Sequence, residues 1–392
     1  MSCTTRHGQY SSFFVGWLKG YLTYMKLKFT FILICLFAGL LCKAQIQFID
    51  EQNKLPIPSV NVYDGTGGLI GFTNKNGVVR FLDNGVKKQK LPLAVTVQHI
   101  SYETKSISLA SLDGKQMYSL APRPLVLNEV AVNTKAKEVV VLKGYFRSLE
   151  TFNHQHKYFA DGIVEFFIPL KKGKTKYRMV DYRVFIDSTV VKDYNAKMGP
   201  FFQIPRFTEI DSRKLADRLN DLVKENDRSN RIRLLKKGNE VGYLTTDADR
   251  SNVQLYLDKV LPDTVVNEKL FSLEAKTFHE VTIENYNATE LNSITPFNLT
   301  ALYQNIVASL KRKKEYGHIP CEMLNELYIM ESRYITEEEY KSNQKGLMKS
   351  IYTTPQKSNY KTRFWEKLED YHIPVINDGL AKQLGEGLQL IH

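Results

Sequence analysis

Short β-prone stretches separated by turn residues constrain the fold of this chain more than any other feature of its sequence. Between residues 46 and 121, apolar segments such as 46–49 and 78–82 recur about every ten residues and are divided by Gly, Pro and Asn. The segment from Asn74 to Gly77 is typical of a tight turn, in which glycine supplies a positive φ. Strands at this spacing favour an all-β sandwich with a small core.

Several short motifs in this region follow one family pattern. They are Phe48-Ile49-Asp50, Pro56-Ile57-Pro58-Ser59-Val60-Asn61-Val62, Gly71-Phe72-Thr73-Asn74 with Gly77 and Phe81, and Ile100-Ser101-Tyr102. Over residues 46–121 the chain thus resembles the carboxypeptidase regulatory-like domain, which is common in exported proteins of the Bacteroidetes type. The resemblance implies a prealbumin-like, seven-stranded β-sandwich that serves as an accessory domain for folding or binding, and it implies no peptidase activity. Phe72 departs from the family pattern, which has Thr after the glycine.

An apolar run near the beginning of the chain predicts export. Lys26 and Lys28 precede an apolar run of fourteen residues over 29–42. This run is shorter than the roughly 20 residues of a membrane-spanning helix and has the length of the apolar part of a secretory signal peptide. The small side chain of Ala44 then predicts cleavage between Ala44 and Gln45.

Two alternatives stay open for this leader. Met25 is followed by Lys, so it is a natural start and Met1 would then be an unused upstream start. Cys42 could instead carry a lipid, although the large Leu41 in front of it disfavours the lipoprotein pattern. In either case, no transmembrane helix is expected in the mature chain.

The domain organisation follows from these features. We expect an upstream segment and signal peptide over 1–44, the sandwich over 45–122, a linker over 123–145 and a larger antiparallel α+β domain over 146–392. Within this last domain, alternation in segments such as 177–186 predicts strands with one face toward water. The fold class is therefore mainly β with some α+β, and the large domain is expected to form a curved, half-open sheet.

Specific elements are expected in the large domain. Leucine spacing predicts a helix over 212–225 with Asp211 or Ser212 as its N-cap, and Thr336 with Glu339 predicts a capping box that opens a second helix. Residues 299–314 fit neither type of element clearly. The remaining expected elements are a helix over 364–371 and strands over 163–168, 177–186, 232–235, 242–245, 253–257, 278–283 and 324–335.

Charge and cysteine content exclude some functions. The chain has 54 Lys+Arg and 42 Asp+Glu, and residues 1–44 hold five of the basic residues and no acidic ones, which leaves a net charge of +7 beyond them. The basic residues are scattered and form no arginine-rich stripe, so no nucleic-acid partner is expected. Cys321 is the only cysteine after residue 44, which excludes an internal disulfide and a cysteine-rich zinc site.

The sequence contains few patterns that indicate chemistry. His154-Gln155-His156 could form a two-pronged metal site, but a surface loop is the favoured interpretation. His279 begins like a zinc-protease motif, yet Ile283 stands where the second histidine is required. Gly-x-Ser-x-Gly and phosphate-binding glycine loops are absent. We therefore predict no catalytic residue, no metal site and no cofactor.

The resulting hypothesis is a non-catalytic, exported cell-envelope protein that binds a polymer, a lipid or a protein partner in the periplasm, at the outer membrane or outside the cell. Aromatic side chains are dense in the large domain, and Tyr158, Tyr328, Tyr334 and Trp365 are the predicted contacts because such rings stack on sugars or line lipid grooves. The alternative is a hydrolase that acts on envelope polysaccharide or peptide. Convergent carboxylates or histidines with shifted pKa values would favour that alternative.

Overall fold

The structure is a computed structural model of the 392-residue chain. It describes residues 45–82, 91–111, 115–123, 138–171, 173–199, 209–227, 231–246, 251–261, 264–350 and 355–392. The predicted signal peptide and the Ala44 side of its cleavage site lie outside these residues. Within the described ranges, no helix has both the length and the apolar character that crossing a bilayer requires.

The described residues of the first domain form seven strands in two sheets. The strands β1 (Gln45–Asp50) and β7 (Lys115–Leu120) form a parallel pair. The other sheet has the order β4-β3-β2-β5-β6. Its strands are β2 (Asn61–Tyr63), β3 (Leu69–Thr73), β4 (Val79–Phe81), β5 (Leu93–His99) and β6 (Tyr102–Leu109).

Apolar side chains from both sheets form one core between them. Phe48 of β1, Leu120 of β7 and Val97 of β5 are almost completely buried together. Gly77 has a φ of 69° and donates from its N–H to the carbonyl of Asn74 at 2.8 Å, as its turn requires. This part of the fold prediction, a seven-stranded sandwich, is confirmed. Phe81, however, is only partly buried at the edge of this core.

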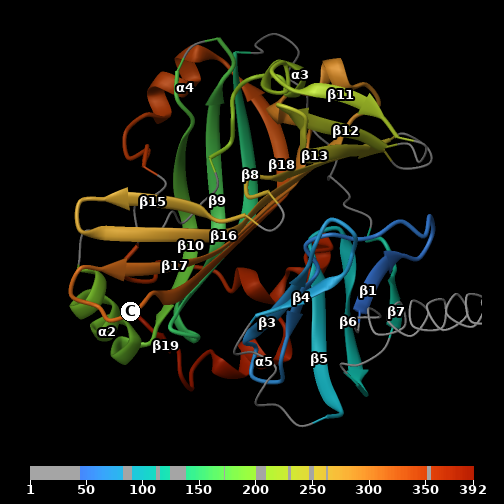
Figure 1. Cartoon of the computed structure of the whole chain (residues 1–392). Helices are drawn as coiled ribbons and strands as arrows, with labels where there is room; N and C mark the ends of the chain where they lie inside the picture. Colours follow the sequence, from blue (N-terminus) through green and yellow to red (C-terminus); the bar gives the residue numbers. More distant parts are fainter. Residues whose placement is uncertain are drawn as a thin grey trace, which may run out of the picture.

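The second domain is built on one large antiparallel sheet with the order β11-β12-β13-β14-β16-β17-β18-β8-β9-β10-β19, and β15 pairs with β16 (Figure 1). The first of its strands, β8, lies inside the sheet, between β18 and β9. The strands are β8 (Val139–Phe152), β9 (Gln155–Pro169), β10 (Lys176–Ile186), β11 (Val223–Asn226), β12 (Arg231–Lys236), β13 (Asn239–Thr246), β14 (Asn252–Asp258), β15 (Val266–Leu270), β16 (Leu273–Asn287), β17 (Leu299–Arg312), β18 (Ile319–Ile335) and β19 (Gln389–Leu390).

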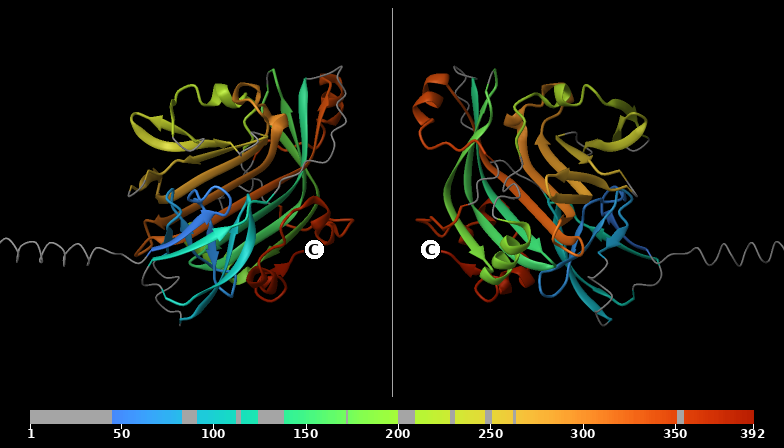
Figure 2. Two further views of the ribbon diagram at one scale, coloured as in Figure 1. Left: turned by 90° about the vertical axis from the view of Figure 1, so that its right-hand side faces the viewer. Right: turned by 60° about the vertical axis from the view of Figure 1, so that its left-hand side comes forward.

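The large sheet is strongly curved and stays open. Figure 2 shows it as a trough, with β8–β10 in one wall and β12–β16 in the other. The expected curved, half-open sheet is thus confirmed, and the ambiguous residues 299–314 belong to strand β17. The predicted linker over 123–145 is too long, because β8 begins at Val139 and pairs with β9 and β18.

Helices are short and lie at the borders of the sheet. The α-helices are α2 (Ser188–Met198), α3 (Leu215–Arg218), α4 (Glu337–Asn343) and α5 (Asp378–Gln383), and single 3₁₀ turns are η1 (Leu291–Ser293), η2 (Pro296–Asn298), η3 (Phe364–Glu366) and η4 (Glu369–Tyr371). The predicted capping box of α4 is confirmed for Thr336, whose Oγ1 accepts from the N–H of Glu339 at 3.0 Å, whereas the Glu339 carboxylate pairs with Arg333 at 3.2 Å. The helix expected over 364–371 is instead the pair of turns η3 and η4.

The helix expected over 212–225 is wrong. Only one turn, α3, forms there, and its N-cap is Lys214. Leu215 and Leu219 are buried in the trough, whereas Val223 begins strand β11 and pairs with Leu235 of β12. Hydrogen bonding to a neighbouring strand therefore outweighs the helical leucine spacing.

The two faces of the large sheet differ in composition. The apolar face lines the trough and includes Val140, Leu142 and Phe146 on β8. The opposite face, which we name the tyrosine face, is covered by the sandwich and by residues 364–373. It carries Tyr145, Tyr243, Tyr256, Tyr303 and Tyr328.

Candidate functional site

A polar pocket of about 250 Å³ lies where the sandwich meets the large domain. Its walls come from the β2–β3 turn, the β8–β9 turn, strand β18, the start of α2 and the segment that follows α5. We name it the junction pocket. Its lining residues are Thr66, Gly68, Leu69, Thr151, His154, Gln155, His156, Asp187, Glu322, Gln383, Gly387 and Leu388.

The two histidines that the sequence drew attention to both line this pocket. Asn153 and His154 form the two-residue turn between β8 and β9, with φ values of 52° and 63°, a pattern typical of type I′ hairpins. His156 lies in β9, and its Nε2 is 3.2 Å from the carbonyl oxygen of Gly67. Burial lowers the pKa of His154 and of His156 below the usual value, which favours neutral rings at neutral pH.

The two imidazoles do not extend from one strand, because His154 is part of the turn and His156 lies in β9. Among the described residues, no group of three or more His, Cys, Asp or Glu side chains is placed to hold a metal ion.

Glu322 is the carboxyl group of the pocket with the most altered acidity. It lies on β18 opposite Thr151 of β8 and is almost completely buried. Burial raises the pKa of Glu322 to about 7, and the Thr151 hydroxyl opposes this effect. The carboxyl group can therefore either donate or accept a hydrogen bond near neutral pH.

Asp187, the second carboxylate of the lining, has a structural task. Its Oδ1 accepts from the N–H groups of Thr189 at 2.8 Å and Val190 at 3.1 Å, so it caps the N-terminus of α2. Lys157 forms a buried ion pair with Glu150 at 2.5 Å. Its Nζ also lies 3.7 Å from the centre of the Tyr194 ring on α2, so the lysine connects this helix to the large sheet.

A contact between two glycines fixes the remaining wall. Gly67, in the β2–β3 turn, has a φ of 80°, and a Cβ added there would lie 2.4 Å from the nitrogen of Leu380. A Cβ added at Gly379 of α5 would lie 2.2 Å from the nitrogen of Gly67. Only glycine lets these two backbones approach so closely, and this approach places Gln383 beside the pocket.

The four aromatic residues predicted as contacts do not line the junction pocket. Tyr158 lies in the core of the apolar face and Tyr328 in that of the tyrosine face, each 3% exposed, so the prediction is wrong for both. Tyr334 is partly buried and stacks on Phe297 with ring centres 4.3 Å apart. Trp365 is partly buried with the Arg183 guanidinium 4.0 Å from its ring centre. A binding role for these last two stays a prediction.

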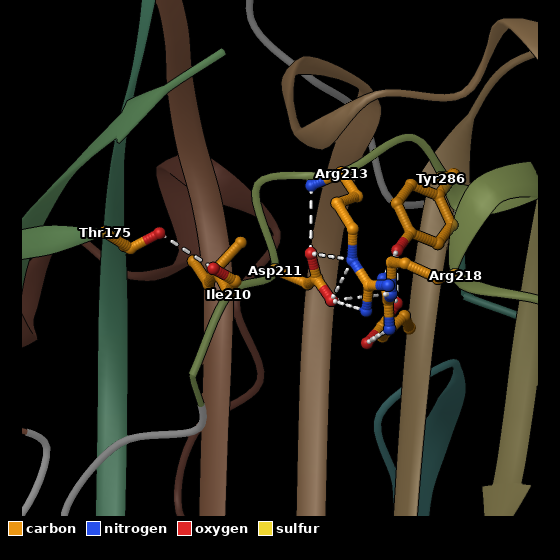
Figure 3. A network of polar contacts seen from close by, with 7 residues as sticks. Thr175, Ile210, Asp211, Arg213, Arg218 and Tyr286 are labelled. Atoms are coloured by element: carbon orange, nitrogen blue, oxygen red, sulfur yellow. Dashed lines mark hydrogen bonds and ion pairs between the residues drawn. The ribbon is translucent and has the colours of Figure 1, made fainter. Parts of the chain in front are cut away.

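A second polar site lies in the trough but is closed. Figure 3 shows Asp211, Arg213, Arg218 and Tyr286 joined in one network. Both terminal nitrogens of Arg218 donate to the Glu284 carboxylate at 2.8 Å, and Arg213 Nη2 donates to Asp211 at 2.7 Å. These charges satisfy one another, so the network anchors the segment containing α3 over the apolar face. The cavity beside it has a volume of about 10 Å³, which leaves little room for a ligand.

Sequence reasoning found part of the junction pocket and missed the rest. The histidine pair was visible as a motif, but Glu322, Thr151 and Gln383 gave no signal because their meeting depends on strand register and on contacts between distant segments. Cys321, next to Glu322, is buried and free, and burial raises the pKa of its thiol.

Comparisons with known proteins give little further information. No family model matches the chain, and no curated protein matches it. The resemblance to the carboxypeptidase regulatory-like domain therefore stays a prediction. A solved structure described as "Lipid-protein interactions in lipovitellin" is 10% identical, with a TM-score of 0.21, over 60% of this chain and 30% of that one. A similarity this low supports no argument about fold or ligand.

Proposed function

We propose that this protein is an exported, non-catalytic component of the cell envelope that binds a hydroxylated segment of an envelope polymer, such as a sugar unit, in the junction pocket. The observation that carries the proposal is the polarity of the lining, in which most side chains offer a hydroxyl, amide, imidazole or carboxyl group. Binding sites for drug-sized ligands occupy about 300–1,000 Å³. A volume of about 250 Å³ therefore suits a small group or one unit of a polymer.

The pocket offers both kinds of hydrogen-bonding group that a sugar needs. Gln155 and Gln383 have amides that donate and accept, and Thr66 and Thr151 contribute hydroxyls. His154 and Gln155 are exposed at the pocket entrance, so they can contact a ligand without any change in the core. The lining contains no aromatic ring for stacking except the two imidazoles.

A hydrolase is the second candidate, and Glu322 is the observation that favours it. A buried carboxyl group with a pKa of about 7 is suited to general acid or base catalysis near neutral pH. Glycoside hydrolysis usually requires a second carboxylate in the same site. The other one here, Asp187, is engaged in capping α2, and for this reason binding is the better-supported function.

Binding can be tested with a panel of envelope glycans and peptides, using calorimetry and ligand-observed NMR. The double variant His154→Ala/Gln155→Ala should weaken binding of a positive ligand at least about tenfold, because each lost hydrogen bond contributes about 1 kcal/mol. Gln52→Ala is a matched control, since Gln52 is an exposed glutamine in a turn that does not line the pocket. Equal affinity of the double variant and this control would contradict the proposed site.

The same panel separates the two candidate functions. If a ligand is turned over, and Glu322→Gln abolishes turnover while keeping affinity, the hydrolase is the correct function. Binding without turnover supports the first proposal.

Export, the remaining part of the proposal, is supported by the sequence of residues 1–44. Cell fractionation and N-terminal sequencing test it. We expect the chain in the envelope fraction with Gln45 as its first residue, whereas retention in the cytoplasm would contradict export.

A further inference from the structure

Two neighbouring turns at one end of the large sheet present exposed aromatic rings. Phe271 is in the turn between β15 and β16 and is 93% exposed, and Tyr316 is fully exposed in the loop between β17 and β18. Leu273 pairs with Arg312, and Lys313 donates from its N–H to the carbonyl of Ser272 at 3.2 Å. The two turns therefore form one projecting edge, at the left of Figure 1. We name it the hairpin edge and define it as residues 266–277 and 309–318.

The backbone at Phe271 indicates that its ring serves a purpose other than folding. Phe271 has a φ of 53°, in the left-handed region that favours glycine or asparagine and penalises bulky side chains. An aromatic residue at this position strains the turn while burying almost none of its own surface. Strain retained at an exposed position is typical of functional sites.

The charge of the hairpin edge complements an anionic surface. Its two segments contain six basic and three acidic side chains. Among the described residues, Lys269 pairs with Glu274, and no ion pair engages Lys276, Lys313 or Lys314. The basic residues are Lys269, Lys276, Lys311, Arg312, Lys313 and Lys314.

We propose that the hairpin edge docks the protein on an anionic lipid surface, with Phe271 and Tyr316 entering the headgroup region and the surrounding lysines contacting lipid phosphates. Aromatic residues favour the boundary between water and hydrocarbon, and lysines near an anionic bilayer add attraction that salt screens. Two rings on separate turns offer too little area for a stable protein interface, which needs about 800 Å² per partner. This inference does not depend on the junction pocket.

The test is sedimentation of the chain from Gln45, which contains all described strands and helices, with vesicles. Starting at Gln45 removes the apolar run over 29–42, which would bind lipid by itself. We expect binding to vesicles of phosphatidylcholine with about a third phosphatidylglycerol, at least about tenfold weaker binding to phosphatidylcholine alone, and loss of binding at about 0.5 M salt. Equal binding to both vesicles, or none to the anionic ones at low salt, would overturn the proposal.

Variants locate the contact. Lys313→Glu/Lys314→Glu should weaken binding to anionic vesicles at least about thirtyfold. The matched control is Lys345→Glu/Lys349→Glu, which changes the charge equally at two exposed lysines of the loop after α4, outside the hairpin edge. If both pairs weaken binding equally, general charge and not the hairpin edge is responsible, and the proposal fails.

Phe271→Asn separates function from folding. Asparagine tolerates a positive φ, so this variant should be as stable as the parent or more stable, yet it should bind anionic vesicles about three- to tenfold more weakly. If neither Phe271→Asn nor Tyr316→Ala changes vesicle binding, the two rings do not contact lipid, and the proposal that they enter the headgroup region is wrong.

Discussion

The apolar face and the tyrosine face of the large sheet use alternate residues of the same strands for different purposes. On β8, Val140 and Leu142 lie in the core of the trough, while Tyr145 points to the side that carries the sandwich. The apolar face is covered in part by Leu215 and Leu219 and excludes water. It stabilises the domain through non-directional burial of apolar surface.

The tyrosine face instead holds the sandwich by directional contacts. Tyr303 donates from its hydroxyl to Asn61 Oδ1 at 3.0 Å, and Asn305 Nδ2 donates to the same oxygen at 3.2 Å. Asn285 Nδ2 donates to Ser101 Oγ at 2.9 Å, in a second link between the domains. Hydrogen bonds at fixed positions define an orientation, which apolar contact alone does not. The difference suggests that one face provides stability and the other provides the geometry of the junction pocket.

The largest expected effect is on the apolar face. Phe146→Ala should lower the free energy of unfolding by about 3–5 kcal/mol, because the ring is 2% exposed and its removal leaves a cavity. Urea titration measures the loss. Phe271→Ala, which changes an exposed ring on the same sheet, should cost no stability, and a similar loss in both variants would contradict the contrast between buried and exposed sites.

The second-largest expected effect is a loss of folding stability at acidic pH, caused by a histidine on the tyrosine face. His279 stacks on Phe72 of the sandwich with ring centres 4.0 Å apart, and no hydrogen-bond partner for its Nε2 lies among the described residues. Burial, helped by Arg80, lowers the pKa of His279 to about 3 from 6.5. The unfolded chain then binds the extra proton between these values, so stability falls as pH decreases from 6.5 toward 3.

From pH 7.5 to pH 4, this histidine should account for about 3 kcal/mol of lost stability. His279→Phe should remove that part of the pH dependence, as measured by thermal or urea unfolding at several pH values. Identical pH profiles of the variant and the parent would show that His279 is not buried in its neutral form.

A smaller effect with the opposite sign is expected at Glu322. Its pKa is raised to about 7 from 4.5, so the folded chain holds a proton that the unfolded chain loses. Stability should therefore fall by about 2 kcal/mol as pH rises from 5 to 7. Glu322→Gln should abolish this decrease, and a persistent decrease in that variant would assign it to another group.

The smallest effect is expected for a single hydrogen bond across the domain junction. Tyr303→Phe removes the hydroxyl but keeps the ring, and it leaves Asn61 Oδ1 with its bond from Asn305. A loss of about 1 kcal/mol is expected. A loss of several kcal/mol would mean that the tyrosine face contributes to stability as much as the apolar face does.

Sequence patterns predicted those parts of the fold that depend on local physics. Alternation over 177–186 identified β10, the glycine requirement at Gly77 identified a turn, and Thr336 identified the start of α4. Each of these depends on residues that are close in sequence. They could therefore be predicted without knowledge of the rest of the chain.

The parts that failed depend on distant partners. Val223 joins a strand because β12 offers hydrogen bonds to it, which the leucine spacing of 212–225 cannot reveal. Tyr158 and Tyr328 were expected as contacts from their residue type alone, and strand register placed them in the core. Most of the junction pocket was equally invisible, because Thr66, Glu322 and Gln383 come together only through the packing of two domains.

The glycine contact between Gly67 and Gly379 has a consequence for the time course of folding. The two residues are separated by more than 300 positions, and the pocket wall that contains Gln383 and Leu388 depends on their approach. A chain emerging from its N-terminus can complete the sandwich long before residue 383 exists. The junction pocket is therefore closed only after synthesis has passed this point, so a truncated product would lack the wall and with it the complete binding site.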